Sequence, residues 1–141
     1  MKNILTLFAL SLTFVWSSHA EPLKSLKVGE STPEFKIKDT QGKEIDLSKL
    51  SAKGPVLVRL TCGCIGCDRE LPYFQALNEA YKKNKINLVA IFAEPDEKFA
   101  EYVKSKILNM QYALDPKKNS WKIFGTKTMP SNFLIDRGVK W

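Results

Sequence analysis

The chain has 141 residues, 44% of them hydrophobic and 26% charged, a balance that excludes wholesale disorder and fits one globular domain. Lys and Arg number 22 against 15 Asp and Glu, so the formal net charge is +7. The basic residues are scattered and do not alternate with aromatic residues, so we expect no nucleic-acid partner. Three cysteines are too few for a disulfide-stabilised scaffold.

The first twenty residues have the pattern of a secretory signal peptide. Lys2 is their only charged residue, and residues 4–16 are almost continuously apolar. Small residues at Ser18 and Ala20 then fit a cleavage site. We therefore predict that residues 1–20 are removed after Ala20 and that the mature protein is periplasmic or secreted. An uncleaved membrane anchor is the alternative, but the apolar run is shorter than the roughly 20 residues that span a bilayer.

The predicted mature domain, residues 21–141, contains no histidine, because the single histidine of the chain is His19. This absence removes histidine general bases, Ser-His and Cys-His nucleophile pairs, and metal sites that use imidazole. Sulfur and carboxylate groups remain for chemistry. We predict no cofactor and no structural zinc, because no fourth ligand is suitably spaced beside the cysteines.

The first elements of this domain are predicted to be a hairpin, a buried strand and a helix. Residues 36–38 and 45–47 form two strands around a turn in which Gly42 supplies the unusual dihedral angle. Residues 56–60 are a β-branched run typical of a buried strand. An amphipathic helix is predicted from Glu70 onward, because apolar residues then recur at helical spacing: Leu71, Phe74, Leu77 and Tyr81.

The second half of the domain continues this alternation. Residues 87–92 predict another buried strand, and a helix beginning at Pro95-Asp96 carries an apolar stripe of Phe99, Tyr102, Val103 and Ile107. A weak strand at 112–114, a short helical piece at 121–124 and a strand at 132–135 follow. The order predicts an α/β domain of three layers with a central mixed sheet and an N-terminal β-hairpin.

Three cysteines lie where the predicted buried strand meets the helix. Cys64 and Cys67 are three residues apart, and at a helix start this spacing brings both side chains to one face, within reach of a disulfide. Unpaired N–H groups and the helix dipole stabilise a thiolate at the first position, so Cys64 is the better nucleophile. For Cys62 two interpretations stand: a buried strand-end residue, or a second partner for Cys64 in a cramped bridge.

These residues resemble the thioredoxin-like superfamily and, within it, the exported TlpA/ResA-like thiol-disulfide oxidoreductases related to the AhpC/TSA redoxins. Residues 64–67 and 70–72 are similar to the branch's Cys-x-x-Cys-x-x-Glu-x-Pro pattern. Residues 28–35 resemble the entry to its amino-terminal hairpin, and residues 125–130 with 133–136 resemble its cis-proline turn and the following strand. The resemblance spans nearly the whole mature chain and implies a thioredoxin-like three-layer sandwich.

The resemblance also implies roles for single residues. Cys64 would attack a substrate disulfide, and Cys67 would resolve the mixed disulfide. Glu70 would shuttle a proton and raise the thiol pKa values, although its position equally suits a glutamate in the first turn of a helix. Pro130 would follow a cis peptide bond and face the cysteines, which leaves the backbone of Met129 to pair with an extended substrate segment.

The chain departs from the family pattern at several positions. Gly63 and Gly66 stand where Trp and Pro are usual, and both make the loop more flexible. Arg59 lies near the place of a buried Asp in thioredoxin; it either depresses the thiolate pKa or extends to the sheet edge. The family's last strand and helix are missing after Gly138, so we expect a domain truncated at its carboxyl end. A fragment explains this best; otherwise a partner, or a second copy in a weak homo-oligomer, covers the bare sheet face.

The leading functional hypothesis is an extracytoplasmic thiol-disulfide oxidoreductase that exchanges disulfides with protein substrates. The family implies a membrane or periplasmic electron donor and, for some members, a reducing role in cytochrome c maturation. The residues do not fix the redox direction.

Three alternatives stand beside it. A peroxiredoxin-like peroxidase is supported by Thr61, three residues before Cys64, but Leu57 and Pro130 occupy the places of that family's Pro and Arg. A non-enzymatic Cu(I) carrier is the second, because thiolates select Cu(I). The last is an inert disulfide in a domain that has lost its activity.

Overall fold

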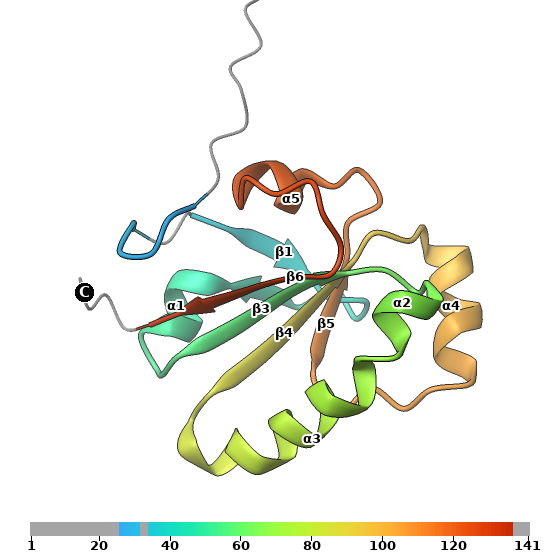
Figure 1. Ribbon diagram of the computed structural model, residues 1–141, viewed down its shortest axis with the longest axis horizontal. Helices are drawn as coiled ribbons and strands as arrows, with labels where there is room; N and C mark the ends of the chain where they lie inside the picture. Colours follow the sequence, from blue (N-terminus) through green and yellow to red (C-terminus); the bar gives the residue numbers. More distant parts are fainter. Residues whose placement is uncertain (1–25, 32–33, 137–141) are drawn as a thin grey trace, which may run out of the picture.

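The computed structural model describes residues 26–31 and 34–136 of the chain. The predicted signal peptide and the region after Gly138 lie outside these residues. Within them a mixed sheet has helices on both faces and a small hairpin beside it (Figure 1). The predicted α/β class, the central mixed sheet and the N-terminal hairpin are therefore confirmed. No helix in the described ranges is long and apolar enough to cross a membrane.

The sheet has two central strands, each paired on both sides. The first, β3 (Val56–Thr61), lies parallel to the second, β4 (Asn87–Phe92), and β4 lies parallel to β5 (Gln111–Leu114). On the other side of β3, the strand β6 (Ser131–Ile135) runs antiparallel, so the order is β5-β4-β3-β6. The strands β3 and β4 fall where apolar, β-branched runs predicted them, because both bury residues on both faces. The strands β5 and β6 also fall at predicted strands, but β6 leaves Leu134 70% exposed.

The hairpin consists of β1 (Lys36–Lys38) and β2 (Glu44–Asp46), which pair antiparallel. Its turn is held by Asp39, whose Oδ1 accepts the backbone N–H groups of two later turn residues at 2.9 and 2.8 Å. Gly42 has a φ of 82°, as the turn requires. A bridge between Asp39 and Ala113 joins the hairpin to β5.

A short helix, α1 (Leu47–Ser51), replaces the end of the second predicted strand. Asp46 causes this change, because its carboxylate caps the helix by accepting the backbone N–H of Lys49 at 3.2 Å. The Nζ of Lys36 lies 3.3 Å from the same carboxylate. The prediction that Leu47 continues the strand is wrong: it is the first helical residue and is fully buried.

The remaining helices follow the predicted order with two corrections. The predicted helix at Glu70 is preceded by a separate turn of helix, so α2 (Ile65–Asp68) comes before α3 (Leu71–Tyr81) and the 3₁₀ turn η1 (Lys82–Asn84). The helix α4 (Asp96–Lys104) ends before Ile107, which is 87% exposed and does not belong to the apolar stripe. The last described helix, α5 (Asn119–Ile123), lies between β5 and β6.

Alternate residues of the strands contribute to two separate cores, one on each face of the sheet. One face packs against the hairpin, α1 and α5, and the other packs against α3 and α4. Each fully buried Val, Leu, Ile or Phe side chain contributes about 1.5–3 kcal/mol to folding. The first core holds Val56, Val58, Leu60, Val89, Ile91, Trp121 and Phe124; the second holds Leu71, Leu88, Ala90, Phe92 and Phe99. Both cores fix the carboxyl end of β3, where the cysteines begin.

Candidate active site

The three cysteines form one cluster at the carboxyl end of β3. Cys62 follows the strand and is buried, Cys64 precedes α2 and is exposed, and Cys67 lies within α2 and is buried. All three are free thiols, and their Sγ atoms lie within 4.8 Å of one another. The structure therefore brings Cys64 and Cys67 together, as predicted. Cys62 is the buried strand-end residue of the first interpretation, but its Sγ lies 3.2 Å from that of Cys67, a pairing that neither interpretation included.

A sharp turn at Gly63 folds the chain back so that the sulfurs meet. The backbone N–H of Gly63 donates to Oε1 of Glu94 at 2.7 Å, which ties the turn to the residue two places after β4. A side chain at Gly63 would place its Cβ 3.1 Å from Cδ2 of Tyr102. Close packing against this ring accounts for the small residue where the family usually has Trp. The turn of α2 is closed by the N–H of Asp68, which donates to the carbonyl of Cys64 at 2.9 Å.

The thiols differ in acidity because they differ in burial and hydrogen bonding. A hydrogen bond from the Cys62 thiol lowers the pKa of Cys64, and the backbone N–H of Cys67 lowers it further. Burial raises the pKa of Cys62 to about 12, and its hydrogen bonds to Cys64 and Cys67 add to this effect. The lowered pKa supports the prediction that Cys64 is the nucleophile. The largest contribution is the neighbouring Cys62 thiol, which the prediction did not include, and backbone N–H groups of Cys67 and Gly66 at the start of α2 contribute as predicted.

Arg59 lies beneath the cysteine loop and connects three elements. It is 2% exposed, and its guanidinium donates to Oε2 of Glu70 at 2.9 Å and to the carbonyl of Cys67 at 3.2 Å. A longer contact of 3.4 Å reaches Oδ1 of Asn132 on β6. The guanidinium also stacks over the ring of Phe74, 4.1 Å from its centroid. The alternative that Arg59 extends to the sheet edge is therefore wrong.

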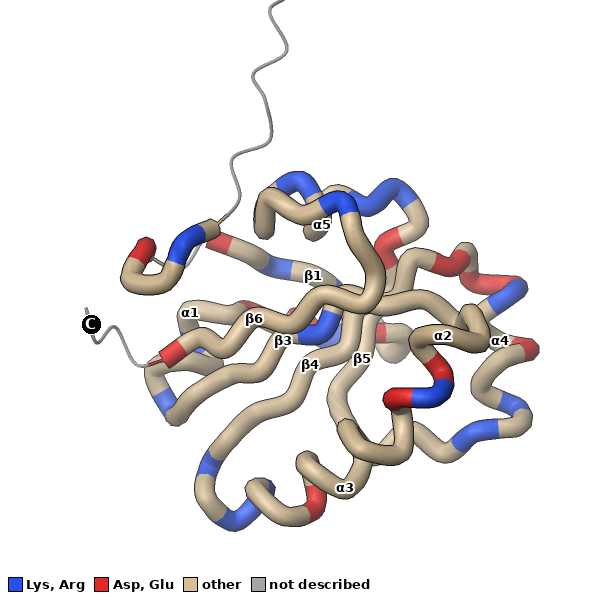
Figure 2. The backbone as a smooth tube through the Cα atoms, in the orientation of Figure 1, with Lys and Arg blue, Asp and Glu red and all other residues tan. Residues whose placement is uncertain are grey.

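Glu70 lies where α2 leads into α3, in a segment of alternating acidic and basic residues (Figure 2). Its side chain is 47% exposed and makes no capping hydrogen bond to α3. Its backbone N–H donates to the carbonyl of Cys67 at 3.2 Å, and its carboxylate pairs with Arg59. The residue is thus held one turn from Cys67 by both backbone and side chain.

Polar side chains on α4 and just after it make a second set of contacts with the cysteine loop. The hydroxyl of Tyr102 donates to Oδ1 of Asp68 at 2.9 Å, and Lys106 donates to the other carboxylate oxygen. The hydrogen bond from Lys106 lowers the pKa of Asp68, whereas burial and the contact with Asp68 raise the pKa of Tyr102.

Glu94 accepts a hydrogen bond from Gly63 through one carboxylate oxygen, and its buried Oε2 has no hydrogen-bond partner among the described residues. None of these contacts was predicted from the sequence; a carboxylate just after a buried parallel strand was the available signal for Glu94.

The Met129–Pro130 peptide bond is cis, as the family resemblance implied. Pro130 directly precedes β6, whose first residue, Ser131, pairs with Leu60. The antiparallel register therefore places Pro130 opposite the end of β3, where the cysteines follow. Hydroxyl groups of Thr126 and Ser131 hydrogen-bond at 2.9 Å across this turn.

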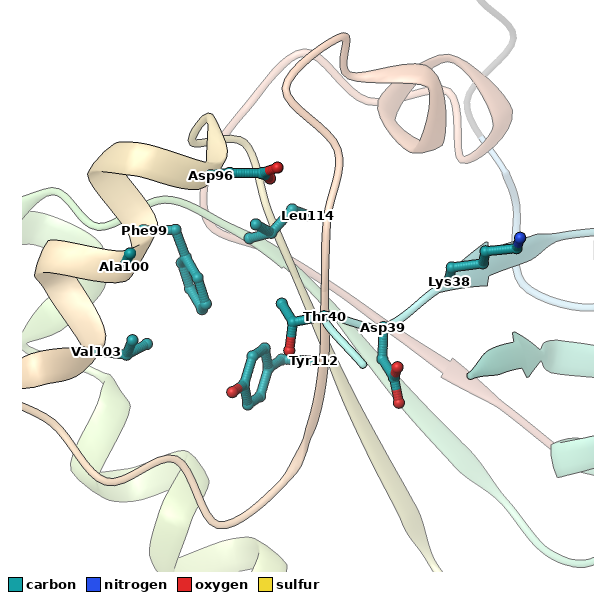
Figure 3. Close-up of a pocket in the computed structure, with 9 residues that line it drawn as sticks. All are labelled: Lys38, Asp39, Thr40, Asp96, Phe99, Ala100, Val103, Tyr112 and Leu114. Carbon is teal, nitrogen blue, oxygen red and sulfur yellow. The ribbon is translucent and has the colours of Figure 1, made fainter. Parts of the chain in front are cut away.

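A cavity of about 500 Å³ lies between the hairpin turn and α4 (Figure 3). Asp39 and Thr40 line one side, and Phe99 and Tyr112 line the other. None of the three cysteines contributes to its lining. The cavity is therefore separate from the cysteine cluster.

A Cys-x-x-Cys pair between a central strand and a helix, with a cis-proline turn beside that strand, is the arrangement of a thioredoxin-like thiol-disulfide oxidoreductase. Residues 28–140 match the model of the AhpC/TSA family. The chain belongs to this family and, within it, groups with the ResA-type thiol-disulfide oxidoreductases.

Two relatives and one solved structure illustrate the similarity. The thiol-disulfide oxidoreductase ResA of Bacillus thuringiensis subsp. konkukian is 30% identical over 118 residues, which cover 83% of this chain and 68% of that protein. ResA of Geobacillus thermodenitrificans is 30% identical over 141 residues, or 97% and 79% of the two chains. A crystal structure from Chlorobium tepidum, described as a candidate thiol:disulfide interchange protein DsbE, has a TM-score of 0.75 and 25% identity, with 82% of each chain covered.

Proposed function

We propose that the protein exchanges disulfides with protein substrates outside the cytoplasm, through Cys64 and Cys67, after residues 1–20 have been removed. One observation carries this proposal: an exposed thiol with a lowered pKa lies within 4.8 Å of a buried thiol. The exposed sulfur of Cys64 is accessible to a large substrate, whereas the buried sulfur of Cys67 is accessible only to Cys64 and Cys62. This difference suits a nucleophile and a resolving thiol.

The exchange proceeds in two balanced steps. The Cys64 thiolate attacks one sulfur of a substrate disulfide, the substrate S–S bond breaks, and the other substrate sulfur leaves as a thiolate that takes up a proton. Cys67 loses its proton and attacks Sγ of Cys64, which forms the Cys64–Cys67 disulfide and releases the second substrate sulfur. Two electrons and two protons have then passed to the substrate. A dithiol donor in the membrane or periplasm restores the pair, and the reverse sequence oxidises a dithiol.

Glu70 and the Met129–Pro130 turn assist these steps. Glu70 accepts the proton that Cys67 loses; its place one turn after Cys67 and its half-exposed carboxylate support this role. The backbone of Met129 pairs with an extended segment of the substrate beside the cysteines. The position of Pro130 opposite the end of β3 supports this second role.

Oxidised Cys-x-x-Cys-His segments of apocytochromes c are the substrate class that we propose, with the protein as reductant. The support is the family resemblance and the similarity to ResA-type proteins. Such a segment carries two closely spaced sulfurs, which form a disulfide when it is oxidised. An exposed disulfide of this kind suits attack by the exposed Cys64.

The deciding experiment equilibrates the purified protein across thiol/disulfide ratios, alkylates free thiols and maps each cysteine by mass spectrometry. We expect a reversible Cys64–Cys67 pair with Cys62 free. Cys64→Ser should abolish exchange, and Cys67→Ser should accumulate a mixed disulfide with the substrate. Cys62→Ser should keep most of the exchange activity. Exchange that survives Cys64→Ser but not Cys62→Ser contradicts the proposal.

Three further measurements test the finer parts of the proposal. An oxidised Cys-x-x-Cys-His peptide should be reduced faster than a peptide of the same composition in scrambled order. Equal rates contradict the substrate class. Consumption of hydrogen peroxide that outpaces disulfide exchange would instead identify a peroxidase. Amino-terminal sequencing of the exported protein should begin at Glu21, and a chain that keeps Met1 contradicts the cleavage.

A further inference from the structure

Disulfide exchange breaks and forms bonds at two of the three clustered sulfurs, and the third, that of Cys62, forms no bond in it. Cys62 is buried, yet its Sγ lies 3.2 Å from one active-site sulfur, and all three sulfurs lie within 4.8 Å of one another. A residue needed only to fill the end of a strand does not have to direct its sulfur toward two other sulfurs. We propose that reduced Cys62, Cys64 and Cys67 together bind one Cu(I) ion in a three-sulfur site. This inference goes beyond the proposed exchange reaction.

The spacing of the sulfurs suits a metal ion with three ligands. At a metal–sulfur distance of about 2.3 Å, three sulfurs in a plane around one ion lie about 4.0 Å apart. The observed spacings, 3.2 Å for Cys62 and Cys67 and at most 4.8 Å for the others, lie on both sides of this value. Small rotations of the side chains therefore suffice to form the site, without any movement of β3.

The chemistry of the ligands selects the ion. Sulfur ligands are soft and favour Cu(I) over the hard cations Mg²⁺ and Ca²⁺, which require oxygen. A structural zinc site needs four ligands, and no fourth His, Cys, Asp or Glu joins the three cysteines among the described residues. The predicted mature chain also lacks histidine, so imidazole does not compete as a ligand. A three-sulfur site therefore favours Cu(I) over Zn²⁺.

Burial and charge around the cluster suit such a site. Cys62 and Cys67 lie below the surface and shield the ion from water, whereas the exposed Cys64 gives it an entry path. One Cu(I) with three thiolates carries two net negative charges. The buried guanidinium of Arg59 pairs with Glu70 and also donates to the carbonyl of Cys67 at 3.2 Å, which places a positive charge beside the cluster.

The proposal makes copper binding and disulfide formation mutually exclusive. When Cys64 and Cys67 form a disulfide, they pass two electrons to an acceptor, and the site loses two of its three ligands. A bound Cu(I) ion is then released without a change in its own oxidation state. By linkage, Cu(I) in turn makes the thiol pair harder to oxidise. The reduced protein is thus the copper-binding form and the oxidised protein is the releasing form.

The test is an anaerobic titration of the fully reduced protein with Cu(I), in competition with the coloured chelator bicinchoninate. We expect one Cu(I) per chain, and X-ray absorption should show three sulfur neighbours. Even outer partners of metal ligands cost about 10–100-fold in affinity when they are removed, so loss of a direct ligand in Cys62→Ser should cost at least about 100-fold. Met110→Leu, which removes a buried sulfur in the second core, is the matched control and should leave the affinity unchanged.

Several outcomes overturn the proposal. Cys62→Ser that binds Cu(I) as tightly as the unaltered protein shows that two sulfurs suffice. Protein with the Cys64–Cys67 disulfide that still binds one Cu(I) places the ion elsewhere, and Zn²⁺ that displaces Cu(I) contradicts the choice of metal. Near-UV circular dichroism checks the fold of each variant; if Cys62→Ser does not fold, Cys64→Ser, at an exposed position, must show the same loss. Normal disulfide exchange without Cu(I) binding refutes only this inference, because the exchange reaction is mapped separately.

Discussion

The two faces of β3 are buried to the same degree but by different means. On one face, Val56, Val58 and Leu60 are surrounded by apolar side chains of the first core. On the other face, Arg59 is equally buried but is held by hydrogen bonds to Glu70 and to the carbonyl of Cys67. An apolar environment tolerates replacement by residues of similar volume, whereas a buried polar group loses stability when a single partner is removed. The apolar face of β3 therefore provides rigidity, and the face that carries Arg59 provides the specific placement of the cysteine loop.

The largest effect that we expect is a complete change of disulfide pairing in Cys64→Ser. The remaining thiols, Cys62 and Cys67, have their sulfurs 3.2 Å apart. Oxidation of the variant should therefore give a buried Cys62–Cys67 bridge instead of an intermolecular dimer. Mass mapping after mild oxidation measures this outcome, with Cys62→Ser/Cys64→Ser as the control. A disulfide-linked dimer would show that the loop after β3 does not hold the sulfurs as described.

At the apolar part of the strand, Leu60→Ala should lower the free energy of unfolding by about 2–5 kcal/mol, because it leaves a cavity in the first core. Urea unfolding measures this change. Leu134→Ala on β6 is the matched control: that side chain is 70% exposed. Leu134→Ala should therefore lower the free energy of unfolding by no more than about 0.5 kcal/mol. Equal losses in the two variants contradict the described packing of the first core.

On the face that carries Arg59, Arg59→Met should cost about 0.5–1.5 kcal/mol, because the carbonyl of Cys67 loses one donor but keeps the backbone N–H of Glu70. The half-exposed carboxylate of Glu70 regains water and limits the loss. Arg69→Met, at an exposed position of the same loop, should change stability little. Urea unfolding of both variants measures the difference, and a stabilising effect of Arg59→Met would mean that packing outweighs hydrogen bonding on this face too.

Alanine substitutions at Gly63 and Gly66 should change the stability of the protein in opposite directions. Nothing lies within 4 Å of a Cβ placed on Gly66, so Gly66→Ala in α2 should stabilise the protein by about 0.4–1 kcal/mol. A Cβ on Gly63 would lie 3.1 Å from the ring of Tyr102, which is held by Asp68 and does not move freely. Thermal unfolding should therefore place Gly63→Ala about 1 kcal/mol below Gly66→Ala in stability. The reverse order would contradict the contact with Tyr102.

The smallest effect that we expect concerns Asp46, whose carboxylate caps the helix α1 outside the cysteine loop. The backbone N–H of Lys49 lowers the pKa of Asp46 in the folded protein, and Lys36 lowers it further. Because the folded pKa is below the unfolded value of about 3.9, the contribution of Asp46 is complete above that value and is lost as the pH falls through the folded pKa. The difference in urea midpoint between the unaltered protein and Asp46→Asn should narrow as the pH falls from 7 toward 3. A constant difference contradicts the cap.

The sheet could be predicted from the sequence because its signals are local. Apolar, β-branched runs mark β3 and β4, and the spacing of two cysteines marks the active-site pair. The α1 helix was missed because it depends on one side chain, Asp46, that caps it. The contact between Cys62 and Cys67 was missed because it depends on the sharp turn at Gly63.

Polar contacts between distant parts of the chain could not be predicted in this way. Glu94, Tyr102 and Lys106 come from a different strand and helix than the loop that they border. Periodicity shows which face of an element is buried, but it does not show which polar groups meet across the domain. The burial of Arg59 has the same origin, because its partner Asn132 lies on the last described strand.

The register of the sheet has a consequence for the order of events during synthesis. One edge of β3 pairs with β6, and in this pairing Val56 lies opposite Ile135. This edge therefore stays open during synthesis until Ile135 has left the ribosome. The three cysteines are close in sequence and meet long before this. Until β6 arrives, the nascent chain presents an open strand edge together with reactive thiols, and both can engage other chains. Because the sheet closes late, the chain is most exposed to aggregation and to unwanted disulfides in the interval before β6 has been synthesised.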